Sequence, residues 1–179
     1  LEPGQKFSLI CGGKTIEGDS TKASVSYPHL HRVVRPGNTI YLDDGLIEIQ
    51  VDEVVDETIH CTVVIGGPLT SRKGLMLPDT DIDLPAMTER DKEHIRYGVE
   101  LGVDMIAASF VRKAEHVRAV REVTREAGGD QPIIAKIENR QGVQHLEEIV
   151  QESDGVMVAR VDLGVHSPPE EVPLVQKQI

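Results

Sequence analysis

Two pairs of charged residues, each separated by one position, carry the clearest chemical signal in the chain. Lys136 and Glu138 end one apolar run, and Arg160 and Asp162 follow the next one. Residues two apart on a strand face the same side, so each pair is predicted to project together. Two carboxylates suit Mg²⁺ or Mn²⁺, and a lysine beside such an ion can stabilise charge on a transferred phosphoryl group or an enolate. The alternative is an ordinary surface salt bridge.

Alternating strands and helices must position these residues. After Pro85, apolar runs of strand length alternate with helical patterns. The expected strands are residues 103–110, 132–138 and 155–159, and the expected helices are residues 88–102, 114–127 and 143–150. Nearly continuous apolar runs joined by helices are typical of parallel strands, whose carboxyl ends form the active face of α/β enzymes.

Three βα units neither close an eight-stranded barrel nor complete a doubly wound sheet. We therefore expect the chain to be an excerpt of a longer enzyme, poorly folded and inactive when made alone. The alternative is a compact three-stranded α/β domain.

The first half of the chain has a different pattern, with short strands separated by turns. The expected strands include residues 7–10, 39–42 and 46–51, and Asp44-Gly45 predicts a hairpin because the turn needs residues that tolerate positive φ. These observations predict a small β domain over residues 1–84, followed by a βα part over residues 85–179.

Composition limits the classes of partner. The 179 residues carry a formal net charge of −11, and cations interleaved with carboxylates argue against nucleic acid. No apolar run approaches the roughly 20 residues that span a bilayer, and the N-terminus lacks the features of a signal peptide, so we expect no membrane partner and a cytoplasmic location. Cys11 and Cys61 do not have metal-ligand spacing and are expected to pack as small apolar groups.

Longer motifs around the charged pairs resemble the pyruvate kinase family. Residues 104–113, residues 134–139 (Ile-Ala-Lys-Ile-Glu-Asn) and residues 153–164 are similar to its active-site region. Residues 27–47 are similar to its inserted β domain, and residues 73–85 to the return from that domain. The resemblance implies a partial (β/α)₈ TIM barrel with an inserted small β-barrel lid domain. It implies phosphoryl transfer from phosphoenolpyruvate to ADP, giving pyruvate and ATP in glycolysis.

The resemblance also implies roles for single residues of the second half. Lys136 would stabilise the transferring phosphoryl group and the enolate. Glu138 and Asp162 would hold Mg²⁺ or Mn²⁺. The backbone of Val161 and Asp162 would receive the substrate carboxylate, while Arg160 braces that loop.

Other implications concern the lid and the complete protein. Lys73 would reach the nucleotide phosphates, although a cation beside Arg72 is more often simply solvated. K⁺ is expected as a second cation, with its ligands outside this chain, and the complete protein is expected to be a homotetramer.

Three departures from the family pattern lie beside the expected metal ligand. Val161 replaces a glycine, His166 a glutamate and Ser167 an aliphatic residue. A β-branched residue adopts positive φ poorly, so Val161 is expected to block the carboxylate pocket or to twist the loop that aims Asp162. These departures motivate the alternative of a non-catalytic or regulatory paralogue. A third hypothesis is another phosphoenolpyruvate- or pyruvate-using barrel, such as a metal-dependent aldolase, but the lid-like first half argues against it.

Overall fold

The computed structural model describes residues 1–78, 85–166 and 169–179. The chain divides into two compact units, Leu1–Ile82 and Asp83–Ile179. The domain boundary predicted after residue 84 lies outside the described residues. Within the described residues, we find no helix of the length and hydropathy that crossing a membrane requires.

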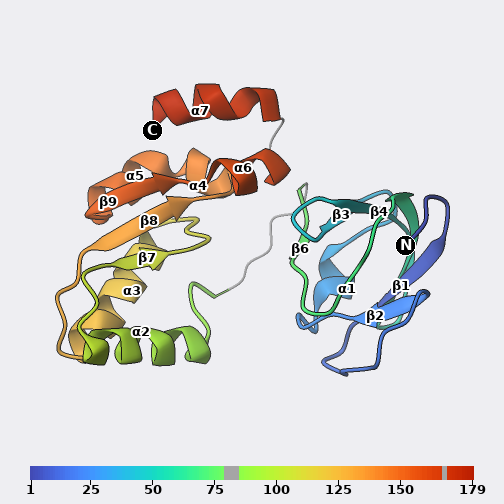
Figure 1. Ribbon diagram of the computed structural model, residues 1–179, viewed down its shortest axis with the longest axis horizontal. Helices are drawn as coiled ribbons and strands as arrows, with labels where there is room; N and C mark the ends of the chain where they lie inside the picture. Colours follow the sequence, from blue (N-terminus) through green and yellow to red (C-terminus); the bar gives the residue numbers. More distant parts are fainter. Residues whose placement is uncertain (79–84, 167–168) are drawn as a thin grey trace. The chain divides into compact units, whose positions relative to one another are not determined.

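The first unit (Figure 1) contains a six-stranded sheet with the order β2-β1-β5-β4-β3-β6. Its elements are β1 Lys6–Ile10, β2 Lys22–Ser24, α1 Leu30–Val33, β3 Thr39–Leu42, β4 Ile47–Val55, β5 Thr58–Ile65 and β6 Leu75–Met76. The strands predicted at residues 7–10, 39–42 and 46–51 are confirmed as β1, β3 and β4. In β1, β4 and β5, alternate side chains enter a buried core that includes Phe7, Leu9, Ile47, Ile49, Ile59 and Val63.

The predicted hairpin joins β3 to β4. Asp43, Asp44 and Gly45 all have positive φ, at 52°, 55° and 84°. Aspartate and glycine tolerate this left-handed backbone better than other residues, which is why these residue types indicated the turn.

Cys11 and Cys61 are buried free thiols, and burial raises the pKa of Cys61 to about 12. Both therefore pack as protonated apolar groups, as expected.

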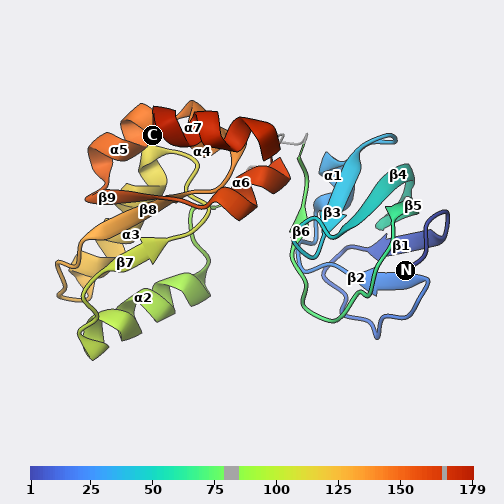
Figure 2. The same cartoon turned by 45° about the horizontal axis from the view of Figure 1, so that its top comes forward.

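The second unit has mixed α/β structure around a three-stranded parallel sheet with the order β7-β8-β9 (Figure 2). The strands are β7 Ile106–Ala108, β8 Ile133–Ile137 and β9 Gly155–Val158. The helices are α2 Glu89–Leu101, α3 Ala114–Glu126, α4 Arg140–Gln144, α5 Leu146–Glu152, α6 Arg160–His166, the 3₁₀ turn Pro169–Glu171 and α7 Val172–Gln178. The predicted alternation of parallel strands and helices is confirmed, although β7 is shorter than the apolar run of residues 103–110.

Helix α2 begins and ends as the sequence predicts. The Thr88 side chain accepts a hydrogen bond from the Asp91 amide, and the Asp91 carboxylate accepts one from the Thr88 amide, which completes a capping box. Gly102 ends the helix with a left-handed φ of 70°.

The core of the second unit lies between the sheet and helices α3 and α5. Val117 and Val120 of α3 and Ile149 of α5 share this buried cluster with the alternate residues of β8, namely Ile133, Ala135 and Ile137. Because successive side chains of a strand point to opposite faces, Ile134 and Lys136 are directed to the other face of the sheet. Because one face of β8 packs in the core, the side chains on its opposite face, which include Lys136, are available to contact a ligand.

The prediction of a single helix over residues 143–150 is wrong. The chain forms α4 and α5, which meet at His145, where φ is −103° and ψ is 19°. Val143, Leu146 and Ile149 all pack in the same core on both sides of the break. Their apolar period continues across the interruption, which explains why the sequence pattern indicates one helix.

Candidate active site at the carboxyl ends of the parallel strands

The predicted pair at the end of β8, Lys136 and Glu138, is in direct contact. Lys136 Nζ lies 2.5 Å from Glu138 Oε1, and the exposed fractions of the two side chains are 24% and 2%. Both groups therefore project to the same side, as their spacing predicts. A carboxylate this deeply buried needs charged or hydrogen-bonding partners, because burial strongly disfavours an isolated ion. Lys136 also retains access to solvent, so its ammonium group can meet a ligand.

Two residues at the end of β7 complete the partners of this pair. The Phe110 amide donates a hydrogen bond of 2.6 Å to Glu138 Oε2, and Lys136 Nζ donates one of 2.9 Å to Ser109 Oγ. The spacing of the charged pairs does not indicate either residue, although both lie within the family-like block of residues 104–113. Their proximity arises from the parallel register of β7 and β8, in which Ala108 is opposite Ala135.

A third contact follows one residue later in both segments. Asn139 Nδ2 donates to the Val111 carbonyl at 3.3 Å, and Asn139 Oδ1 accepts from the Gly142 amide at 2.8 Å. A Cβ on Gly142 would lie 2.7 Å from the Val111 carbonyl oxygen, which is closer than real Cβ contacts. Asn139 therefore begins α4 and ties it to the segment after β7.

Arg160 and Asp162 are not arranged as predicted. Strand β9 ends at Val158, and both residues lie in α6, Arg160–His166. In a helix, residues two apart point to different sides, so these two side chains do not project together as they would on a strand. Arg160 is exposed and Asp162 is half-buried. The apolar run continues to Ala159, whose amide still donates to the Ile137 carbonyl of β8 at 3.2 Å, before the chain turns into α6.

The prediction of backbone strain at Val161 is also wrong. Val161 lies in the first turn of α6, and its side chain is 76% exposed. Within the described part of the chain, the non-glycine residues with positive φ are Asp43, Asp44, Asp56, Arg72 and Phe110. Valine adopts helical φ readily, so the backbone of Val161 is unstrained. Its side chain can hinder a ligand only through its bulk. Of the other departures, His166 is the last residue of α6, and Ser167 lies outside the described residues.

The first turn of α6 presents backbone donors next to the end of β9. The Leu163 amide donates to the Ala159 carbonyl at 2.9 Å and makes the first bond of this helix. The amides of residues 160–162 precede it and so have no carbonyl partner four residues back within the helix. Such amides suit a carboxylate or another anion.

A divalent cation is compatible with the carboxylates of the second unit. Glu138 follows β8 and Asp162 follows β9, which are paired neighbours in the sheet. Among the described residues, each Glu138 oxygen has one protein partner, which leaves a lone pair on each oxygen for a cation. No group of three His, Cys, Asp or Glu side chains with metal-site geometry occurs among the described residues. Glu138 and Asp162 offer two carboxylates, a number compatible with Mg²⁺ or Mn²⁺, which often take one or two carboxylates and leave other positions to water and substrate.

Lys73 lies in the first unit, on the segment before β6. Its Nζ is 2.9 Å from Asp43 Oδ1 in the hairpin, and this hydrogen bond raises the pKa of Lys73. The Asp43 amide also donates to the Gly74 carbonyl at 3.0 Å. Lys73 is therefore a charged residue whose ammonium group is paired with Asp43, and it is not simply solvated.

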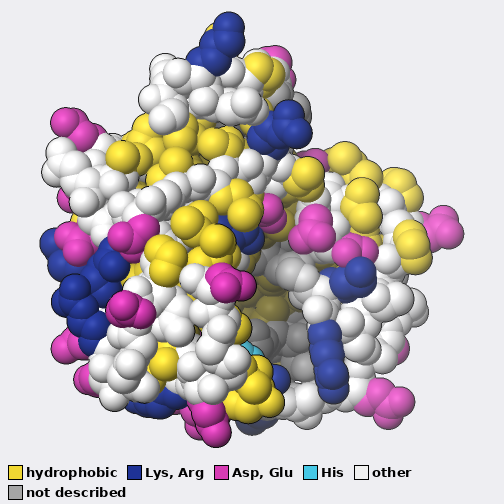
Figure 3. All heavy atoms as spheres, turned by 60° about the vertical axis from the view of Figure 1, so that its left-hand side comes forward, with side chains coloured by type: hydrophobic (Ala, Val, Ile, Leu, Met, Phe, Trp, Pro, Cys, Tyr) yellow, Lys and Arg dark blue, Asp and Glu magenta, His cyan; other side chains and the backbone are white. Residues whose placement is uncertain are grey.

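Two exposed apolar side chains lie near the charged pair in the second unit. On the face shown in Figure 3, hydrophobic side chains gather between charged ones. In the second unit, Met157 is 45% exposed and is opposite Lys136 in the register of β8 and β9. Phe110, at the end of β7, is 54% exposed.

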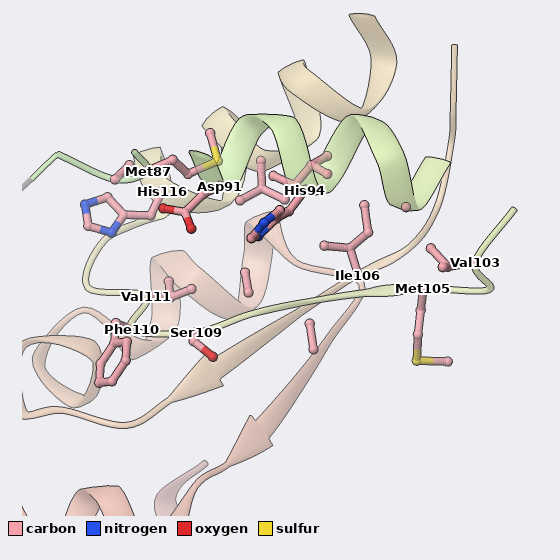
Figure 4. Close-up of a pocket in the computed structure, with 16 residues that line it drawn as sticks. Met87, Asp91, His94, Val103, Met105, Ile106, Ser109, Phe110, Val111 and His116 are labelled. Carbon is pink, nitrogen blue, oxygen red and sulfur yellow. The ribbon is translucent and has the colours of Figure 1, made fainter. Parts of the chain in front are cut away.

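A pocket of about 510 Å³ lies on the other side of β7 (Figure 4). Its lining comes from α2, β7, α3 and the segments beside them and includes Met87, His94 and Ile106. Ser109 and Phe110 touch this pocket, but Figure 4 shows their side chains pointing away from α2. Neither Lys136 nor Glu138 lines it, so this pocket and the charged pair are separate features.

Fold and site together define a class. Parallel strands whose carboxyl ends carry an ammonium group beside a buried carboxylate are typical of α/β enzymes that use this edge as their active face.

Comparison with known proteins specifies the family. A family model described as the pyruvate kinase barrel domain matches residues 1–179. The chain is 47% identical over 180 residues to a pyruvate kinase of Clostridium acetobutylicum, covering 100% of this chain and 38% of that protein. It is 49% identical over 175 residues to pyruvate kinase 1 of Saccharomyces cerevisiae, covering 97% of this chain and 34% of that protein.

A pyruvate kinase of Leishmania mexicana is 49% identical over 162 residues, covering 90% of this chain and 32% of that protein. The chain belongs to the pyruvate kinase family. It spans between 32% and 38% of the length of these three relatives. Family membership confirms the resemblance seen in the sequence and sets aside the aldolase hypothesis.

Proposed function

We propose that this chain supplies part of the active site of a pyruvate kinase, which transfers a phosphoryl group from phosphoenolpyruvate to ADP. The observation that carries the proposal is the contact between Lys136 and the buried Glu138 at the carboxyl end of β8. In the reaction, the bond between phosphorus and the enol oxygen breaks, and a bond to a terminal oxygen of ADP forms. The enolate that remains takes up a proton and becomes pyruvate.

We propose that Lys136 acts on the charge that moves during this transfer. Its ammonium group would donate hydrogen bonds to the transferring phosphoryl group and to the enolate oxygen. Charge develops on these oxygens mainly in the transition state, so a fixed cation accelerates the reaction more than it tightens substrate binding. The contacts with Glu138 and Ser109 support this role because they hold the ammonium group before substrate arrives.

The other roles are proposed from the site geometry and the family. Glu138 and Asp162 would hold Mg²⁺ or Mn²⁺, which would neutralise negative charge on substrate oxygens when bound. The amides of Val161 and Asp162 would receive the substrate carboxylate, a role supported by their place in the first turn of α6. Arg160 would brace the same turn.

For the whole protein, we propose a (β/α)₈ barrel with an inserted lid. The parallel sheet of the second unit would form part of the barrel, and the first unit would be the lid domain over residues 1–84. Lys73 of the lid would bind nucleotide phosphates. K⁺, held by residues outside this chain, a homotetrameric assembly and a cytoplasmic glycolytic role complete the proposal.

The direct test is pyruvate formation by the complete protein that contains this sequence. With phosphoenolpyruvate and ADP, we expect turnover that depends on Mg²⁺ and is abolished when the cation is removed with EDTA. Restoring Mg²⁺ should restore the rate, and Ca²⁺ at the same concentration serves as a control for unspecific charge effects. Binding of Mg²⁺ and ADP without turnover would instead support the regulatory paralogue.

The departure at Val161 gives a second test. If the amide of this residue binds the substrate carboxylate, removing its exposed side chain should ease the approach of the ligand. Val161→Gly in the complete protein should lower the KM for phosphoenolpyruvate severalfold, while glycine in a helix costs about 1 kcal/mol of stability. Val161→Ala is the matched control, since it removes bulk with little helix penalty. An unchanged KM in both variants would contradict a role for this side chain in access.

A further inference from the structure

The segment that follows β7 contacts the site in a regular way. Lys136 bonds to Ser109, Glu138 to the Phe110 amide, and Asn139 to the Val111 carbonyl. Successive residues of one segment thus meet successive polar residues at the end of β8. Residues 109–111 therefore form part of the site and do not merely connect β7 to α3.

Ser109 is suited to orient the Lys136 ammonium group. Its hydroxyl oxygen lies 2.9 Å from Nζ, and the other partner of this group is Glu138 Oε1. When Glu138 gives an oxygen to a cation, its attraction for the ammonium group weakens, whereas the neutral Ser109 hydroxyl stays available. A lysine side chain has several rotatable bonds, so a neutral second partner is what keeps the ammonium group in place.

The backbone of Phe110 indicates that this arrangement is built rather than incidental. Phe110 has a φ of 54°, a conformation that is uncommon for a bulky residue, and its side chain is 54% exposed. Burial of the ring therefore does not account for the strain. The left-handed turn directs the amide to the buried Glu138 carboxylate at 2.6 Å, and strain of this kind is characteristic of functional sites. Ser109 directly precedes this turn, and the register of β7 and β8 brings it beside Lys136.

We propose that Ser109 is a positioning residue for Lys136 in phosphoryl transfer. The proposal rests on the function proposed for Lys136. Ser109 would act through Lys136 and would have no contact with the reacting atoms. Losing its hydroxyl would leave the cation site and the fold intact but would let the ammonium group leave the position required in the transition state.

The test compares Ser109→Thr with Ser109→Val in the complete protein. The two replacements have the same shape and differ in a hydroxyl against a methyl group, and the exposed position can accept either one. We expect Ser109→Val to lower kcat by about 10- to 100-fold, because a displacement near 1 Å has effects of this order. The KM for phosphoenolpyruvate and Mg²⁺ binding, measured by calorimetry, should stay within about twofold. Ser109→Thr should retain most of the parent's kcat.

Ser153→Ala is the matched control, since Ser153 Oγ bonds to the Ile149 carbonyl at the end of α5, away from the pair. It should leave kcat unchanged. Equal losses in the threonine and valine variants would overturn the proposal, as would parallel losses of Mg²⁺ binding and melting temperature in Ser109→Val. The Lys136→Met variant distinguishes failure of the positioning role of Ser109 from failure of the function proposed for Lys136. If Lys136→Met abolishes turnover while Ser109→Val leaves kcat unchanged, only the positioning role of Ser109 fails. If Lys136→Met is itself fully active, the proposed function of Lys136 fails.

Discussion

Replacing Lys136 by methionine should lower kcat of the complete protein by about three orders of magnitude or more. The expected loss is large because the ammonium group would act on charge that develops in the transition state, where one fixed donor or cation contributes strongly. The KM for phosphoenolpyruvate and the affinity for Mg²⁺ should change much less. Steady-state kinetics and a calorimetric Mg²⁺ titration measure these quantities.

The same variant should also reveal the structural part of this contact. Lys136→Met leaves the Glu138 carboxylate, 2% exposed, without its cationic partner at 2.5 Å. Without metal, the variant should therefore unfold at a lower temperature than the parent, by an amount equivalent to about 1–3 kcal/mol. Lys92→Met, which removes an exposed pair with Glu89, is the control and should change neither property. A fall in substrate affinity as large as the fall in kcat would show that Lys136 only binds the ground state.

Replacing Glu138 by glutamine should weaken Mg²⁺ binding sharply and reduce kcat by about a hundredfold or more. The change removes one charged oxygen ligand but keeps the shape of the side chain. The amide oxygen of glutamine can still accept the Phe110 hydrogen bond, so the melting temperature should change little. Glu138→Ala removes that acceptor as well and should cost a further 1–3 kcal/mol or so of stability.

Two comparisons make the metal assignment falsifiable. Asp162→Asn should weaken Mg²⁺ binding in the same direction as Glu138→Gln, because both carboxylates are proposed ligands. Glu115→Gln alters an exposed carboxylate paired with Arg118 on α3 and should bind Mg²⁺ like the parent. If Glu138→Gln and Asp162→Asn both titrate like the parent, the proposed cation site is wrong.

The regular elements near the site could be predicted because their signals are local. The spacing of Lys136 and Glu138 is enough to place both groups on one side, since neighbouring side chains of a strand alternate between faces. The capping box at Thr88 and Asp91 likewise depends on residues three positions apart. Family motifs added the expected chemistry, because they extend over nearly the whole chain.

Errors arose where a local pattern continued across a break. The apolar run of β9 leads directly into α6, so Arg160 and Asp162 seemed to follow the strand period. The apolar period also continues through His145, where one predicted helix is two. In both places, contacts with the rest of the unit determine where the chain turns, and the residue types alone do not record those contacts.

By itself, the sequence determined the family, the alternation of strands and helices and the pair formed by Lys136 and Glu138. The tertiary structure alone decided which residues surround that pair. Ser109 and Phe110 are 27 and 28 positions from their partners, and the parallel register of β7 and β8 brings them there. Register between strands depends on the packing of whole side-chain layers, so no short stretch of residues specifies it.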